Sequence, residues 1–93
     1  MSIVVRFSPT NLTTERYNES LRRLEEKVGE WPPDGLDYHV LFGPEGDMRV
    51  SEIWDSREKF EAFGERLMPL LAELGMEFSG PPEILDAHNI IKR

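Results

Sequence analysis

Residues 36–54 read LDYHVLFGPEGDMRVSEIW, and this stretch decides the fold of the chain. Apolar, aromatic and β-branched side chains recur through 36–42 and again through 48–54, which is typical of two strands. The five residues between them, 43–47, are Gly-Pro-Glu-Gly-Asp, a sequence rich in turn-forming residues. The pattern therefore predicts a β-hairpin.

The register of this hairpin decides which polar side chains meet. If Gly43 pairs with Met48, His39 lies opposite Glu52, because partners in an antiparallel pair are counted outward from the turn. Direct partners share a face of the sheet, so one face would carry four side chains that could take part in binding or catalysis. They are Asp37, His39, Glu52 and Trp54. A shift of one residue would instead separate His39 from Glu52.

The segment before the hairpin predicts a strand and a helix. Residues 2–8 have the alternation of a strand, and Thr13 is a suitable N-cap for a helix that Gly29 ends. The apolar residues of this helix recur at spacings of three and four, which gives it one buried stripe. The stripe consists of Tyr17, Leu21, Leu24 and Val28.

The segment after the hairpin predicts a second helix and a last strand. Asp55 or Ser56 caps the helix, and Pro69 predicts a kink or break because it cannot donate a backbone hydrogen bond. Residues 84–91 then predict the last strand. The buried stripe of the helix consists of Phe60, Phe63, Leu67, Leu70, Leu71 and Leu74.

The order strand-helix-strand, twice, predicts a single α+β domain spanning residues 1–93, a ferredoxin-like βαββαβ fold. It would have a four-stranded antiparallel sheet with both helices on one face. The strands nevertheless carry apolar residues on the second face too, namely Val4, Tyr38, Val40, Phe42 and Ile53. An apolar sheet face of this kind usually marks an interface, so we expect a homodimer that closes a dimeric α+β barrel.

Composition excludes several classes of protein. The chain has no cysteine, which excludes a disulfide scaffold, a cysteine zinc site and a thiol nucleophile. Its net charge of −7, from 18 acidic and 11 basic residues, argues against a nucleic acid partner. The N-terminal residues enter a strand pattern directly, and no apolar run is long enough for a membrane span. We therefore expect a cytoplasmic protein.

The His39–Glu52 pair is the main candidate for chemistry. Glu52 would fix the tautomer of His39, which suits a general acid or base, and Trp54 would form a flat wall for a planar ligand. The alternative is structural: a cross-strand His–Glu pair is often a surface ion pair, and a lone tryptophan often belongs to the core.

Four further residues are candidates for binding substrate. Tyr17 would place its hydroxyl at the rim of the cleft, and Asp37 shares the face of His39. His88 and Asn89 interrupt the last apolar strand, so they would either line the cleft or form hydrogen bonds across the dimer interface. No phosphate-binding loop, dinucleotide fingerprint or spaced metal-ligand motif is present, so no cofactor or metal is expected.

With these residues placed, the chain resembles the dimeric α+β barrel superfamily, and most of all the small antibiotic-biosynthesis-monooxygenase-like proteins. The order of elements carries the resemblance over almost the whole chain. Locally it rests on residues 35–40, on His88-Asn89, and above all on residues 52–60, Glu-Ile-Trp-Asp-Ser-Arg-Glu-Lys-Phe. The last segment is similar to the junction between a strand and a helix in that group.

The resemblance implies a ligand cleft between sheet and helices, in which enzymes of the superfamily act on planar substrates, often without a cofactor. Trp54 matches a tryptophan that lines such clefts. Val50 stands where cofactor-free quinone-forming oxygenases have an asparagine. The first strand lacks the asparagine, and residues 56–74 lack the histidine, that haem-degrading members need, so haem degradation is not expected.

Two functions remain open from the sequence. The first is a homodimer that binds a small planar or apolar ligand and acts as a cofactor-independent monooxygenase or isomerase through His39 and Glu52. The second is a non-enzymatic dimeric module for ligand binding or stress response. A catalytic cleft would be open to solvent and measure at least a few hundred Å³, with His39 and Glu52 inside it, whereas a module would have it filled by Phe60, Phe63 and Leu67.

Overall fold

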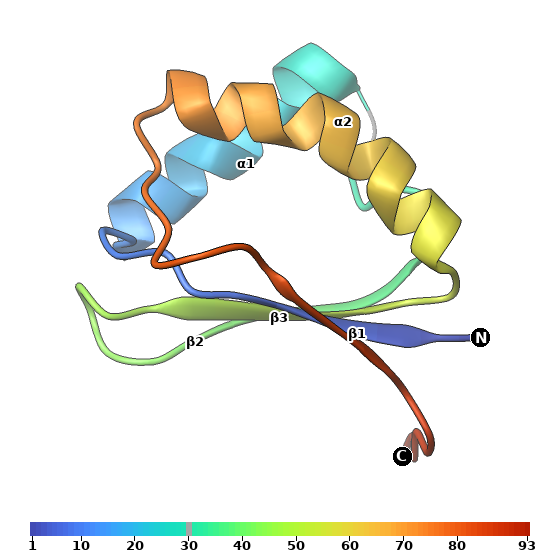
Figure 1. The fold of residues 1–93 in the computed structure, drawn as a ribbon. Helices are drawn as coiled ribbons and strands as arrows, with labels where there is room; N and C mark the ends of the chain where they lie inside the picture. The colour runs from blue at the N-terminus through green and yellow to red at the C-terminus, as the bar shows by residue number, and fades with distance from the viewer. Residues whose placement is uncertain (30) are drawn as a thin grey trace.

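The computed structural model describes residues 1–29 and 31–93. Its elements follow the order strand, helix, strand, strand, helix, strand, which confirms the predicted fold class. Figure 1 shows the two helices together on one face of the sheet. The elements are β1 (Ile3–Phe7), α1 (Thr14–Val28), β2 (Leu36–Phe42), β3 (Arg49–Trp54), α2 (Arg57–Glu73) and β4 (Glu83–Asp86).

The sheet is antiparallel, with the strand order β2-β3-β1-β4. β1 and β3 lie in the centre of the sheet, and β2 and β4 form its two edges. Alternate residues of β1 are buried toward the helices because side chains in a strand point to opposite faces. The buried core joins this face to the two helices and comprises Ile3, Val5, Phe7, Leu12, Leu24, Val50, Trp54, Phe60, Phe63, Leu67, Leu70 and Leu71.

The predicted hairpin register is confirmed where it matters most. His39 pairs with Glu52 and Leu41 with Val50. The same predicted register would also pair Asp37 with Trp54, and this pairing is wrong, since Leu36 takes that place and the register shifts between Leu36 and Tyr38. A bulge inserts one extra residue, here Asp37, and leaves its charged side chain exposed to water at the edge of the sheet.

The helix ends follow the predicted capping chemistry. The hydroxyl of Thr13 accepts a hydrogen bond from the backbone N–H of Arg16, and Gly29 ends α1 with a φ of 74°, in the left-handed region. Of the two candidate caps for α2, Ser56 is the N-cap, and its hydroxyl accepts a hydrogen bond from the backbone N–H of Lys59.

Of the kink or break predicted at Pro69, the break is wrong, because α2 continues through this residue. Figure 1 shows a helix that curves over the sheet without interruption. Glu65 and Pro69 both lie on the exposed side of the helix. The carbonyl of Glu65, which loses its donor to the proline, can therefore bond to water, and this removes most of the reason for a break.

The last strand is shorter than predicted and ends at Asp86 rather than at 91. β4 runs antiparallel to β1, and Asp86 already pairs with Ile3, the first residue of β1. One further backbone hydrogen bond, from Ala87 to Ser2, completes the ladder. Beyond it the chain runs out of partner strand, so His88 and Asn89 lie exposed outside the sheet.

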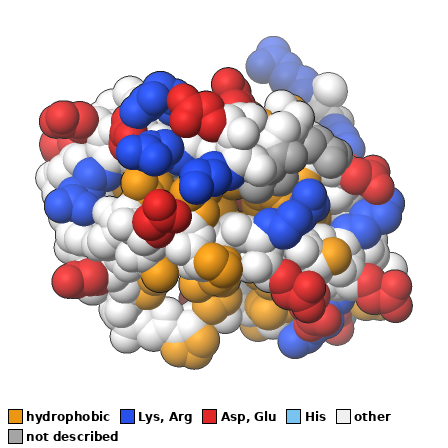
Figure 2. All heavy atoms as spheres, turned by 90° about the horizontal axis from the view of Figure 1, so that it is seen from above, with side chains coloured by type: hydrophobic (Ala, Val, Ile, Leu, Met, Phe, Trp, Pro, Cys, Tyr) orange, Lys and Arg blue, Asp and Glu red, His pale blue; other side chains and the backbone are white. Residues whose placement is uncertain are grey.

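The two outer surfaces of the molecule differ in character. Over the helices, acidic and basic side chains are interspersed (Figure 2), as in the pair formed by Arg22 and Glu19 at 2.7 Å. The sheet face opposite the helices carries large apolar side chains, of which Tyr38 is 58% and Leu85 52% exposed. No described helix is long and apolar enough to cross a membrane.

The β2–β3 turn is tied to the start of α1 by one carboxylate. Glu45 accepts hydrogen bonds from the backbone N–H of Thr14 at 2.7 Å and from its hydroxyl at 2.6 Å. A negative charge is favourable at a helix N-terminus, where backbone N–H groups are unpaired. These bonds from Thr14 lower the pKa of Glu45 below its ordinary value of 4.5.

We predict that Glu45→Gln makes the stability of the protein less dependent on pH. Because the pKa of Glu45 is lowered on folding, its ionised form stabilises the fold above about pH 4.5, and this contribution is lost as the pH falls through the folded pKa. Urea unfolding should therefore show wild type more stable than the variant at pH 7, with the gap closing toward pH 3. Glu73→Gln, an exposed glutamate of α2, is the control; an equal effect from it would contradict the prediction.

Candidate functional site

The hairpin places a histidine and a carboxylate together on the helix side of the sheet. His39 of β2 and Glu52 of β3 are direct cross-strand partners, and Nδ1 of His39 lies 2.6 Å from Oε2 of Glu52. Glu52 is only 5% exposed, although it carries a charge. A surface ion pair, the structural alternative from the sequence, therefore does not describe this contact.

Trp54 holds the other oxygen of the same carboxylate. Its indole Nε1–H donates to Oε1 of Glu52 over 2.9 Å. The indole is fully buried and packs against Phe60 and Phe63, with ring centroids 5.6 and 5.7 Å away. Trp54 does not reach the cavity described below, so its place in the structure is that of a core residue that orients Glu52.

Tyr17 extends the chain of hydrogen bonds to α1. Its hydroxyl lies 2.7 Å from Nε2 of His39, and the two rings stack at an angle of 29°. An ionised carboxylate only accepts hydrogen bonds, so Nδ1 of His39 carries the proton that faces Glu52. In the neutral imidazole Nε2 is then an acceptor, and Tyr17 donates to it.

The environment of Tyr17 keeps its phenol protonated. Burial raises the pKa of Tyr17 above its ordinary value of 10, because an ionised phenolate would lose its hydration. The negative charge of Glu52 raises this pKa further. Tyr17 is therefore a neutral donor to His39 at physiological pH.

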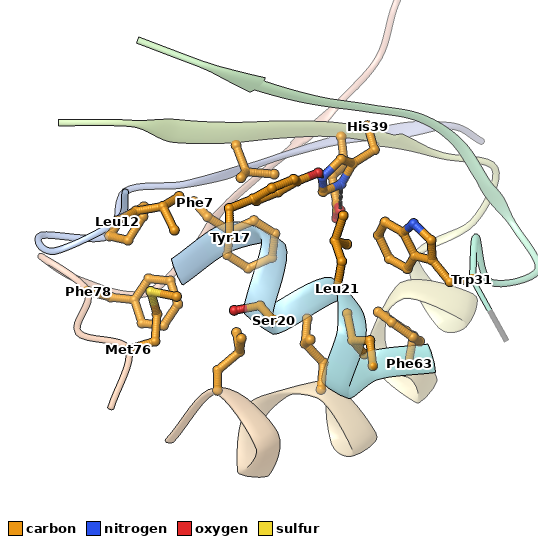
Figure 3. A pocket seen from close by; sticks show the side chains of 16 residues that line it. Phe7, Leu12, Tyr17, Ser20, Leu21, Trp31, His39, Phe63, Met76 and Phe78 are labelled. Carbon is orange, nitrogen blue, oxygen red and sulfur yellow. Dashed lines mark hydrogen bonds and ion pairs between the residues drawn. The ribbon is translucent and has the colours of Figure 1, made fainter. Parts of the chain in front are cut away.

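These residues border a cavity of about 80 Å³ between the sheet and the helices (Figure 3). This is less than the few hundred Å³ expected of a catalytic cleft, and less than the roughly 150 Å³ of an engineered cavity that holds benzene. The wall is almost entirely apolar. Its lining residues are Phe7, Pro9, Leu12, Tyr17, Ser20, Leu21, Leu24, Trp31, His39, Val50, Glu52, Phe63, Leu67, Leu71, Met76 and Phe78.

A second space, a groove of about 280 Å³, lies along the β2 edge. It is lined by Tyr17, Trp31, Pro32, Leu36, Asp37, Tyr38 and His39. Tyr17, Trp31 and His39 border both spaces, so their side chains form the partition between groove and cavity. The rings of Trp31 and His39 pack edge to face, with their centroids 5.1 Å apart and an angle of 87° between their planes.

The structure thus brings together some of the predicted residues and not others. Tyr17, His39 and Glu52 line the cavity, and Asp37 lines only the outer groove. His88 and Asn89 lie exposed beyond β4, near the C-terminus, which Figure 1 shows on the side of the sheet away from the helices. Their predicted role in the cleft has no support from this placement, whereas a role across a dimer interface stays a prediction.

Sequence reasoning missed Trp31 as a site residue. It precedes two prolines in the loop between α1 and β2, outside any periodic pattern, so no strand or helix argument assigns it a face. The only signal was a large aromatic residue held by a stiff Pro-Pro segment. Among residues 1–29 and 31–93, no group of three His, Cys, Asp or Glu side chains is arranged to hold a metal ion.

Comparison with known proteins identifies the fold. No family model and no curated protein matches the sequence. Solved structures do match: the protein YjcS has a TM-score of 0.65 at 10% identity, covering 95% of this chain and 100% of its own. SnoaB, a cofactor-independent oxygenase from Streptomyces nogalater, has a TM-score of 0.60 at 13% identity, covering 99% and 96%.

An antibiotic-biosynthesis-monooxygenase-like protein from Deinococcus radiodurans matches with a TM-score of 0.58 at 15% identity, covering 100% of this chain and 98% of its own. Identities this low establish a common fold and leave the chemistry of each site to be argued separately. The chain has the ferredoxin-like fold of the antibiotic-biosynthesis-monooxygenase-like proteins, which confirms the resemblance inferred from its sequence.

We predict that Trp54→Phe destabilises the protein by about 1–3 kcal/mol from the lost hydrogen bond alone, because it leaves one oxygen of a buried carboxylate without its donor. The loss should be smaller when Glu52 is already glutamine, since a neutral amide oxygen is less costly to leave unpaired. Urea unfolding of the single and double variants gives this difference. An equal cost in both backgrounds would show that the charge of residue 52 adds nothing to the strength of this hydrogen bond.

We also predict that Glu52→Gln lowers the pKa of Tyr17, because it removes the negative charge that raises that pKa. The pKa should remain above 10, since burial is the larger cause. The chain has two tyrosines. In a Tyr38→Phe background, the ultraviolet absorbance of phenolate therefore reports Tyr17 alone. An unchanged titration curve would exclude an electrostatic link between Glu52 and Tyr17.

Proposed function

We propose that this protein is a homodimer that binds a small apolar ligand between sheet and helices and that His39, oriented by Glu52, acts on that ligand as a general base. The observation that carries the proposal is the chain of hydrogen bonds from Trp54 through Glu52 and His39 to Tyr17, which ends in an otherwise apolar cavity. Polar groups buried together in an apolar pocket are the usual arrangement of a ligand site.

The chemistry this arrangement supports is oxygenation without a cofactor. An acidic CH₂ group of the ligand would give its proton to Oη of Tyr17 as Tyr17 passes its own proton to Nε2 of His39, and the resulting carbanion would reduce dioxygen and take the proton back. The hydroperoxide that forms loses water to give a carbonyl, so that CH₂ and O₂ become C=O and H₂O. The substrate supplies all the electrons. SnoaB, which has the same fold, is a cofactor-independent oxygenase.

The volume of the cavity favours a second candidate function, a ligand-binding module without catalysis. At about 80 Å³ the cavity is too small for a planar polycyclic substrate unless side chains move. Leu21 and Phe63 point into the space between the layers (Figure 3), and Leu67 lines the same cavity. A binding module needs the same polar chain only to orient its ligand.

The dimer is supported by a row of apolar residues on the sheet face opposite the helices. Strand pairing aligns Tyr38 with Ile53, Ile53 with Val4, and Val4 with Leu85, so the row crosses all four strands. Its two ends are more than half exposed in the single chain. Packing this face against a second copy would bury the row and lower the free energy of both chains.

Oxygen consumption tests the catalytic proposal. With anthrone, a planar ketone that carries one acidic CH₂ group, wild type should consume O₂ and form the quinone faster than buffer does. His39→Ala should fall to the buffer rate while its mass in sedimentation stays that of the wild-type dimer. A wild-type rate equal to that of buffer, with ligand binding intact, would favour the binding module.

Sedimentation equilibrium tests the dimer. Leu85→Glu should shift the protein from the mass of two chains to that of one, because it would place a charge in the buried row. Met68→Glu is the matched control, since Met68 is an exposed apolar residue of α2 on the helix side. Wild type sedimenting as a single chain would exclude the dimer.

A further inference from the structure

The polar side chains that join the sheet to α1 at the cavity are already paired with one another. Both oxygens of Glu52 are occupied, by Trp54 and by His39, and both ring nitrogens of His39 are occupied, by Glu52 and by Tyr17. The hydroxyl of Ser20 donates to the carbonyl oxygen of Arg16. Tyr17 gives its only proton to His39, but its oxygen keeps lone pairs that can accept.

This direction of the hydrogen bonds makes Tyr17 an acceptor toward a ligand. An alcohol can donate to Oη of Tyr17, while a ketone or an ether of the same shape has no proton to offer. Such a ligand would place its oxygen against the oxygen of Tyr17 and lose the hydrogen bond it had in water. At Tyr17, a ligand that donates a hydrogen bond is therefore favoured over one that can only accept.

Charge restricts the ligand further. No Lys or Arg is among the described residues that line the cavity or the groove. The carboxylate of Glu52 lies in the wall, and the chain as a whole has a net charge of −7. An anionic ligand would be buried beside a like charge with no counter-ion, which is strongly unfavourable.

The arrangement of the cavity and the groove indicates how a ligand would enter. The cavity and the groove are separated by the side chains of Tyr17, Trp31 and His39. His39 is held at both ring nitrogens, whereas Tyr17 and Trp31 come from α1 and the following loop. Transient rotation of Tyr17 and Trp31 would join the two spaces and admit a ligand, and Tyr17 then returns to its hydrogen bond with His39.

We propose that Tyr17 is the specificity-determining residue of this site and selects a neutral, slim, apolar molecule whose single hydroxyl group donates to Tyr17 Oη. His39 sets this specificity by accepting the proton of Tyr17. The inference rests on the ligand-binding part of the proposed function and is independent of oxygenation.

The test compares two ligands of nearly equal shape, 1-phenylethanol and acetophenone, of which only the first can donate a hydrogen bond. Their dissociation constants would be measured by NMR titration of the full-length protein. We expect wild type to bind the alcohol about threefold to tenfold more tightly, the range given by one net hydrogen bond. Benzoate should show no binding at the same concentrations.

Variants test whether the preference for the alcohol over the ketone comes from Tyr17. His39→Leu frees the proton of Tyr17, so the ketone should gain affinity and the preference should disappear or reverse. If His39→Leu does not fold, His39→Leu with Glu52→Gln avoids an unpaired buried carboxylate and gives the same readout. Ser20→Ala removes the other hydroxyl of the wall and should leave the preference unchanged.

Each of four results would overturn the inference: equal binding of both ligands by wild type, no binding of either, an unaltered preference in the His39 variants, or a preference that Ser20→Ala abolishes. The oxygenation proposal is judged separately. A preference without O₂ consumption supports Tyr17 selection and removes catalysis, whereas O₂ consumption that depends on His39 without any preference does the reverse.

Discussion

The burial of one carboxylate, that of Glu52, constrains the rest of the site. A charged group placed in an apolar interior costs several kcal/mol unless its oxygens are paired. Here Trp54 donates a hydrogen bond to one oxygen, and His39 donates one to the other. Trp54 therefore cannot turn toward the cavity, and His39 cannot rotate its Nδ1 away from β3. The core and the site are thus joined through one side chain.

This constraint fixes the direction of the other hydrogen bonds of the site, those made by His39 and Tyr17. The carboxylate fixes the proton on Nδ1 of His39, which leaves Nε2 to accept from Tyr17. Tyr17 stands on α1, whose first turn is held by Glu45 of the β2–β3 turn. The hairpin therefore supplies both the His39–Glu52 pair and the anchor of the helix that covers it. A change in the turn would reach the site through α1.

The sequence predicted those parts of the structure that depend on periodicity. Side chains in a strand alternate with period two, so pairing Gly43 with Met48 was enough to place His39 opposite Glu52. The same rule failed at Asp37, because a bulge is a local departure from the period and leaves no clear mark in the sequence. Likewise, β4 ends where β1 has no residue left to pair with, a limit that apolar pattern alone cannot show.

The role of Trp31 and the size of the cavity depend on tertiary packing and could not be predicted. Trp31 reaches His39 from a loop, and loop conformation is not encoded by a repeating pattern. The cavity volume is the small remainder left when many large side chains pack together. Replacing one lining residue by a slightly larger or smaller one would change it by a large fraction, with no change in the hydrophobic pattern.

The strengths of the bonds decide which part of the site can move. Breaking the contact between Tyr17 and His39 removes a bond to a neutral group, worth about 0.5–1.5 kcal/mol net, which thermal motion overcomes readily. Removing either donor from Glu52 would instead leave a buried charge unpaired, at a cost of several kcal/mol. Any opening of the cavity would therefore proceed through Tyr17 and Trp31, with His39 and Glu52 fixed in place. In the proposed function, a ligand would thus meet a histidine whose position is already set, and only the partition would have to rearrange to admit it.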